Sequence, residues 1–125
     1  MRFELSQKFF FDAAHTLHRE IEAEPSRRIH GHTYQVEVGI VGARNEDTGM
    51  VLDLGYLRRD IEILRDELDH RLLDEVKELG TPTLENICVY ISKRLPGLNG
   101  AASLHYVKVW RDSVGDSCTL RLGNL

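Results

Sequence analysis

His30-Gly31-His32-Thr33-Tyr34-Gln35-Val36-Glu37-Val38-Gly39-Ile40 combines a strand pattern with two histidines, a residue type that can bind metal ions. Apolar and polar residues alternate from Tyr34 onward, and a period of two is typical of a β-strand with one buried face. We predict a strand over residues 32–43. Residues two apart on a strand point to the same face, so His30 and His32 are directed at one point.

A third histidine, His15, ends a segment with the same alternation. His15 shares its parity with Phe9, Phe11 and Ala13, and we predict a strand over residues 2–14. Three imidazoles from neighbouring strands are what a catalytic Zn²⁺ site requires, with a fourth position open to water or substrate. The alternative is a solvated strand face that holds no metal.

The remaining chain predicts two helices and two further strands. Asp53 and Thr83 are the expected N-caps, and apolar residues follow each at helical spacing. Pro96 and Gly97 are expected to end the second helix. The expected elements are completed by a loop over residues 16–29, a strand containing Val107 and Val109, a turn at 114–116 and a strand over 119–122.

This order, β-β-α-α-β-β, predicts an α+β fold in which both helices cover one face of a four-stranded antiparallel sheet. At 125 residues the chain is expected to form one domain, 1–125. A sheet this small leaves open edges and little depth for a pocket. We therefore expect a homo-oligomer with sites at subunit boundaries.

Composition bears on the function class. A net charge of −4 argues against a nucleic-acid-coating surface. No apolar run approaches the roughly 20 residues of a membrane span, and the N-terminus is unlike a signal peptide. We expect no nucleic-acid partner, no membrane partner and a cytoplasmic location. Cys88 lies on the apolar stripe of the second helix and is expected to be a buried, inert thiol.

Five motifs occur in the order found in one enzyme family. They are Phe11–His15, the H-G-H-x-Y stretch His30–Tyr34, the G-M-V-x-D stretch Gly49–Asp53, the L-D-H stretch Leu68–His70 and the P-T-x-E-N stretch Pro82–Asn86. The whole chain resembles the family of 6-pyruvoyltetrahydropterin synthase and the 6-carboxytetrahydropterin synthase of queuosine biosynthesis. The resemblance implies a tunnelling fold, or T-fold, which commonly assembles as a hexamer, a dimer of trimers.

The resemblance also implies an activity, that of a zinc-dependent carbon-oxygen lyase. The family removes triphosphate from dihydroneopterin triphosphate and rearranges the side chain. His15, His30 and His32 match the Zn²⁺ ligands, and Asp69 and His70 match the pair that carries protons. Thr83 and Glu85, in the P-T-x-E-N motif, match substrate-binding positions. The residue-based alternative for Asp69 and His70 is a helix C-terminus, where histidine complements the dipole.

The chain departs from the family at the position of its cysteine. The bacterial enzymes place that cysteine four residues before the first histidine of H-G-H, where this chain has Ser26. A serine hydroxyl is far less acidic than a thiol and cannot serve as the same base unaided. The animal enzymes place it six residues before, where this chain has Glu24. Some members use a nearby glutamate and cleave the side chain differently, so Glu24 is a candidate base if desolvated; otherwise it is one acid among several.

The second departure is in the last motif. The family's V-x-E-T reads Val109-Trp110-Arg111-Asp112 here, and its glutamate accepts hydrogen bonds from the pterin ring. Arg111 is only a donor, which leaves three alternatives. Asp112 takes the role through a one-residue bulge, the ligand presents acceptors such as a carboxylate, or Arg111 pairs with a structural acid and faces solvent.

Arg27 and Arg28 lie next to the predicted ligands and are candidates to contact a triphosphate or carboxylate, although most loop arginines are simply exposed. The sequence thus predicts a pterin-directed lyase acting on dihydroneopterin triphosphate or a related pterin. The alternative is a divergent paralogue that keeps zinc and fold but binds a changed, carboxylate-bearing ligand.

Overall fold

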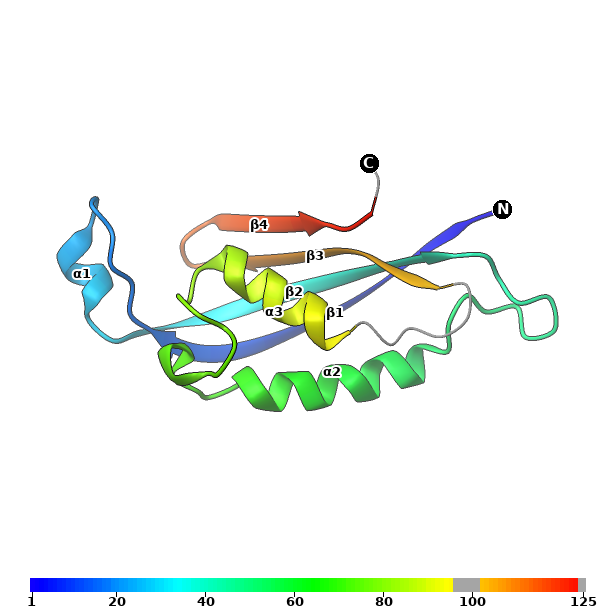
Figure 1. The fold of residues 1–125 in the computed structure, drawn as a ribbon, viewed down its shortest axis with the longest axis horizontal. Helices are drawn as coiled ribbons and strands as arrows, with labels where there is room; N and C mark the ends of the chain where they lie inside the picture. The colour runs from blue at the N-terminus through cyan, green and yellow to red at the C-terminus, as the bar shows by residue number, and fades with distance from the viewer. Residues whose placement is uncertain (96–101, 124–125) are drawn as a thin grey trace.

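Four strands form one antiparallel sheet in the computed structural model, which describes residues 1–95 and 102–123. The strands lie in the sheet in chain order (Figure 1). They are β1 (Phe3–His15), β2 (His30–Gly42), β3 (Ser103–Arg111) and β4 (Asp116–Arg121). The long β1–β2 pairing runs in unbroken register from the start of β1 to its last residue.

Two helices cover one face of this sheet, α2 (Leu54–Leu68) and α3 (Leu84–Arg94) (Figure 1). The predicted caps are confirmed, because Asp53 accepts a hydrogen bond from the Gly55 N–H and Thr83 Oγ1 accepts one from the Asn86 N–H. The α+β prediction with the order β-β-α-α-β-β is therefore confirmed for the main elements. Within the described ranges, no helix has the length and apolar character needed to cross a membrane.

The core lies between the helices and the sheet face formed by odd positions of β1 and even positions of β2. The alternation that predicted the strands is the alternation of burial along them. The buried residues of α2 follow one another at helical spacing, as predicted for the apolar residues behind Asp53. The fully or nearly buried residues of the two helices are Leu57, Ile61, Leu64, Leu68, Ile87, Cys88, Tyr90 and Ile91.

The loop predicted over residues 16–29 was wrong in part, since it contains the short helix α1 (Ala23–Arg27). Pro25 stands in the first turn of α1, where its missing N–H has no intrahelical partner to lose. A 3₁₀ turn, η1 (Leu73–Glu75), was also not predicted. It is too short to show an apolar period.

Strand ends differ from the predicted ones by a few residues. β2 begins at His30 because the ladder with β1 continues to the His15–His30 pair. β4 begins at Asp116 rather than residue 119, because Asp116 pairs with Arg111 and the turn lies before it. Gly115, with φ of 84°, closes that turn by donating its N–H to the Arg111 carbonyl. The predicted helix end at Pro96 and Gly97 lies outside the described residues.

Candidate metal centre

The β1–β2 register brings three histidines together. His15 is directly opposite His30, and Ala13 is opposite His32, so all three side chains leave the same face. The ring centroids are 4.5 Å apart for His15–His30, 5.0 Å for His15–His32 and 4.9 Å for His30–His32. One nitrogen of each ring lies within 4.8 Å of the others. This confirms the predicted convergence.

Backbone carbonyls orient two of these rings. His15 Nδ1 donates to the Pro82 carbonyl at 3.0 Å, and His30 Nδ1 donates to the Arg28 carbonyl at 2.7 Å. A carbonyl only accepts, so these contacts place the ring proton on Nδ1 and leave each Nε2 with its lone pair. Protein metal sites use this arrangement to orient their histidines. The residues present therefore fit a divalent ion such as Zn²⁺.

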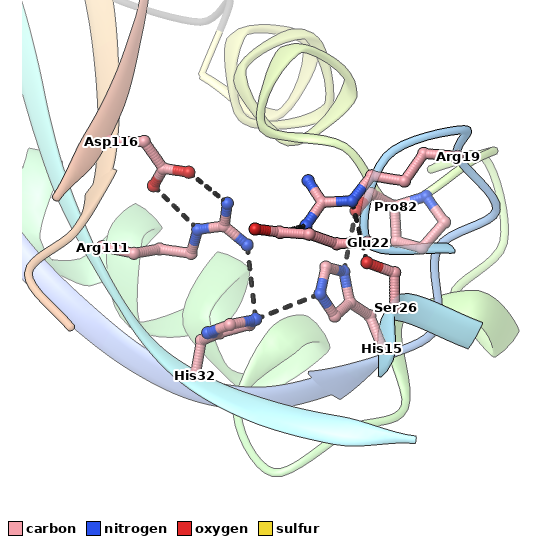
Figure 2. Close-up of polar contacts among 8 residues, drawn as sticks. All are labelled: His15, Arg19, Glu22, Ser26, His32, Pro82, Arg111 and Asp116. Atoms are coloured by element: carbon pink, nitrogen blue, oxygen red, sulfur yellow. Dashed lines mark hydrogen bonds and ion pairs between the residues drawn. The ribbon is translucent and has the colours of Figure 1, made fainter. Parts of the chain in front are cut away.

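The third ring completes the nitrogen cluster. His32 Nε2 lies 3.2 Å from His15 Nε2 (Figure 2). Burial lowers the pKa of His15, and burial followed by the charge of Arg111 lowers the pKa of His32 to about 4. Both rings are thus neutral near pH 7, which is the form that binds metal.

Arg111 lies next to this cluster and is held in place by Asp116. Its Nε donates to Asp116 Oδ1 at 3.0 Å, and its Nη2 donates to Asp116 Oδ2 (Figure 2). Nη1 is 3.3 Å from His32 Nε2. The Arg111 side chain is only 11% exposed. Pairing with an acid is therefore confirmed, but the expectation that such an arginine faces solvent was wrong.

Asp112 does not take the place of the family glutamate through a bulge. The β2–β3 pairing is regular at Gln35–Trp110, and the irregularity that it shows lies between Gly39 and Ile40. Asp112 instead begins the exposed turn between β3 and β4. The bulge alternative was wrong because the hairpin closes directly on Arg111 and Asp116.

Asp69 and His70 form a hydrogen-bonded pair where α2 ends. Asp69 Oδ1 accepts the Asp12 N–H at 2.9 Å, and Oδ2 accepts from His70 Nδ1 at 2.8 Å. The Asp12 N–H is the main reason that the pKa of Asp69 is lowered. His70 adopts φ of 58°, a conformation that costs energy for a non-glycine residue. His70 lines a cleft of about 750 Å³ together with His32 and Asp112.

Two of the predicted site residues of α1, Ser26 and Glu24, differ in burial. Ser26 is buried, and its Oγ accepts from Arg19 Nε at 2.8 Å. Glu24 is 78% exposed and forms an ion pair with Arg28 at 3.0 Å. The condition under which Glu24 was a candidate base, partial desolvation, is therefore not met.

Sequence reasoning missed Glu22. Its φ of 56° is strained for glutamate, and its carboxylate pairs with Arg19 at 2.6 Å. Glu22 lines a cleft of about 490 Å³ with Ser26 and His30, and Figure 2 shows its carboxylate on the side of Arg111 and His15. No signal in the run Glu20-Ile21-Glu22-Ala23-Glu24 distinguishes Glu22 from the other two acids. What sets it apart in the structure is its left-handed backbone angle.

The other predicted binding residues lie outside the histidine cluster. Thr83 caps α3 with its hydroxyl, and Glu85 is exposed in the first turn of that helix. Arg27 is exposed and donates to the Ala23 carbonyl within α1. The motif that contains Thr83 still contacts the histidine cluster, because the Pro82 carbonyl accepts a hydrogen bond from His15 Nδ1.

The model of the family described as 6-pyruvoyl tetrahydropterin synthase matches residues 4–122. The chain belongs to this family. It is similar to the dihydroneopterin monophosphate aldolase of Pyrococcus furiosus, with 35% identity over 101 residues, 80% of this chain and 82% of that protein. It is also similar to the 6-carboxy-5,6,7,8-tetrahydropterin synthase of Synechocystis, with 34% identity over 109 residues, 82% of this chain and 81% of that protein.

A third relative shares more identity over a shorter match. The putative 6-carboxy-5,6,7,8-tetrahydropterin synthase of Pyrococcus horikoshii is 45% identical over 87 residues, 64% of this chain. The match spans about half of that protein, 52%. The solved 6-pyruvoyl tetrahydropterin synthase of Caenorhabditis elegans superimposes with a TM-score of 0.80 over 98% of this chain and 97% of that chain, at 24% identity. The fold is therefore the T-fold of the family.

Proposed function

We propose that this member of the tetrahydropterin synthase family is a metal-dependent lyase acting on the side chain of dihydroneopterin triphosphate or a related dihydropterin. The observation that carries the proposal is the convergence of His15, His30 and His32 with nitrogens within 4.8 Å of one another. Relatives that share about a third of its residues are named as pterin enzymes.

The three histidines would hold Zn²⁺. When bound, such an ion polarises a substrate oxygen as a Lewis acid and so acidifies the adjacent hydrogens. The Pro82 and Arg28 carbonyls fix the rings of His15 and His30, and they increase the basicity of the ligating nitrogens.

We assign proton transfer to His70. Asp69 accepts from His70 Nδ1, so the free Nε2 is the nitrogen that takes and returns a proton. In side-chain cleavage, Nε2 removes a hydroxyl proton, the carbon–carbon bond breaks, and its electron pair passes into the pterin ring. The same proton then returns to the carbon that stays on the ring. This cleavage needs one base and no thiol.

Residue 26 bears on which lyase reaction is favoured. Ser26 occupies the position of the family cysteine, and its buried hydroxyl already accepts from Arg19. The chain therefore presents no thiol at this position, which favours side-chain cleavage over the synthase rearrangement. The aldolase relative from Pyrococcus furiosus is consistent with this preference.

A second candidate function is a paralogue that keeps metal and fold but takes a changed ligand. The observation in its favour is Arg111, paired with Asp116 where the family has an acceptor. Arg27 and Arg28 are exposed near the centre and remain candidates for binding the substrate phosphates.

We also propose that the protein assembles as a hexamer, with sites shared between subunits. Among the described residues, β1 and β4 form the two edges of the sheet. Unpaired edges favour closure by further copies of the chain. Light scattering coupled to size exclusion measures the assembly mass, and a monomer would contradict this assembly.

The activity test incubates zinc-loaded protein separately with dihydroneopterin triphosphate and dihydroneopterin monophosphate. Triphosphate release reports the synthase reaction, and release of a two-carbon aldehyde reports cleavage. We expect aldehyde release, and we expect it to fall sharply in His70→Ala while zinc content is unchanged. Absence of both products with zinc fully loaded would remove the lyase assignment.

A further inference from the structure

The last part of β1, which ends at His15, is paired on both of its sides. On one side it pairs with β2, where Ala14 lies opposite Gly31. On the other side the Ala14 N–H donates to the Arg71 carbonyl at 2.9 Å, and Ala14 forms a parallel β-bridge with Leu72. The chain that follows α2 therefore covers the edge of β1 next to the histidine cluster.

Asp74, in the 3₁₀ turn η1, continues this contact beyond the end of the strand. Thr16 directly follows His15, and its N–H donates to Asp74 Oδ1 at 2.9 Å. The Thr16 hydroxyl donates to Asp74 Oδ2 at 2.6 Å. Two hydrogen bonds to the two oxygens of one carboxylate fix both the position and the orientation of Thr16.

The carboxylate of Asp74 is charged near pH 7 and accepts at both oxygens. Partial desolvation raises its pKa, but the hydrogen bonds that it accepts, chiefly from Thr16, outweigh this effect and lower the pKa overall. An ionised carboxylate is a stronger acceptor than a neutral amide or hydroxyl. The contact with Thr16 is therefore among the stronger hydrogen bonds near the metal centre.

His15 depends on this contact more than a residue inside a strand would. The β1–β2 ladder ends at the His15–His30 pair, so no further pairing with β2 holds the backbone after His15. The Pro82 carbonyl orients the ring through Nδ1 (Figure 2). Asp74 holds the backbone on the far side of the same residue, through Thr16.

A metal centre is sensitive to such support. Zn²⁺ binds imidazole nitrogen at about 2.0–2.1 Å, and plausible sites keep to such distances within about 0.2 Å. A small shift of the His15 backbone would move its Nε2 by more than this tolerance. Groups that orient a ligand without touching the metal commonly change its affinity for that reason.

We propose that Asp74 is a positioning residue of the metal centre, which acts through Thr16 to hold His15 where it can bind the ion. The inference deepens the proposed function and rests on it, since it takes the histidines to bind a divalent ion. The covering segment also carries His70, whose N–H donates to the Asp12 carbonyl at 2.6 Å. One segment thus holds the metal ligand and the proton-transfer residue in a fixed relation.

The test measures zinc affinity by competition with a chromophoric chelator. The proteins compared are the wild type, Asp74→Ala, Asp74→Asn, Thr16→Val and Glu75→Gln. Glu75 is the exposed acid next to Asp74 in the same turn, and its variant is the matched control. The visible spectrum of each cobalt-loaded protein reports the geometry of the ligands, and melting in the presence of chelator reports the stability of the metal-free fold.

We expect Asp74→Ala to bind zinc about tenfold less tightly, at the lower end of the losses typical of outer hydrogen-bond partners, and to alter the cobalt spectrum. Asp74→Asn keeps an oxygen for the Thr16 N–H, so its loss should be smaller. Thr16→Val removes the hydroxyl contact alone and should also weaken binding, which keeps the inference testable if Asp74→Ala does not fold. Glu75→Gln should match the wild type.

Two outcomes would overturn this inference and leave the lyase proposal standing. In the first, Asp74→Ala lowers the melting temperature of the metal-free protein but leaves zinc affinity and the cobalt spectrum unchanged, so that Asp74 only stabilises the fold. In the second, Glu75→Gln loses as much affinity as Asp74→Ala, so that any nearby charge has the same effect. A wild type that binds no zinc would overturn the metal-dependent function itself, and this inference with it.

Discussion

His15 and His30 face each other across the β1–β2 ladder as a directly paired couple, with ring centroids 4.5 Å apart. Each is oriented by a different backbone carbonyl, from Pro82 and from Arg28. The pair therefore joins four segments of the chain: both strands, the end of α1 and the start of α3. A metal bound there would stabilise all four against unfolding.

The first prediction concerns metal content. We expect one equivalent of zinc per chain, and we expect His15→Ala or His30→Ala to abolish stoichiometric binding. The loss of affinity should exceed the roughly 10–100-fold that is typical when only an outer hydrogen-bond partner is removed. Elemental analysis after dialysis measures it. His18→Ala, at an exposed histidine outside the cluster, is the control, and equal metal loss there would contradict the assignment.

The second prediction concerns the pH dependence conferred by Asp69. Its pKa is lowered in the folded protein, chiefly by the Asp12 N–H, so its contribution to stability is present above the unfolded pKa of about 3.9 and is lost as pH falls through the lower folded value. Asp69→Asn keeps an oxygen that can accept the Asp12 N–H and loses only the charge, so it should reduce the free energy of unfolding at pH 7 by about 1 kcal/mol. Urea titrations at pH 7 and near pH 3 measure the difference. A penalty that does not shrink at the acid end would contradict this account.

The third prediction concerns the cap of α3. Thr83→Ala removes the hydroxyl that accepts the Asn86 N–H at 3.1 Å, which should cost about 1 kcal/mol of stability. Thr83→Ser keeps the hydroxyl and should behave like the wild type in the same chemical denaturation. If both variants lose equal stability, the methyl group rather than the cap is responsible.

The fourth prediction concerns Gly39, which lies under the ring of Tyr106. A Cβ at Gly39 would stand 1.9 Å from Tyr106 Cε1, so Gly39→Ala forces the ring to move. We expect a cost of about 1–3 kcal/mol, as for other overpacked sites. Gly31→Ala is the matched control on the same strand, because its nearest atom would be 3.7 Å away. Thermal melts of the two variants should separate clearly, and coincident melts would refute the steric argument.

Local patterns in the sequence were enough to predict the main elements. Alternation identified β1 and β2, and helical spacing behind Asp53 and Thr83 identified α2 and α3. These signals are local, because the direction of a side chain repeats every two residues in a strand and every 3.6 residues in a helix. The shared direction of His30 and His32 was predicted for the same reason, and the parity of His15 predicted it as the third histidine. Family membership also followed from the motifs of the sequence.

Only the tertiary structure decided which groups surround those histidines. Register placed His15 opposite His30, the hairpin turn paired Arg111 with Asp116, and a left-handed backbone angle at Glu22 distinguished it from Glu24. These contacts join residues that are remote in sequence or depend on a single dihedral angle. The periodicity of apolar residues along the sequence does not predict such contacts or such an angle. Both depend on how the strands pair and on how the loops connect them.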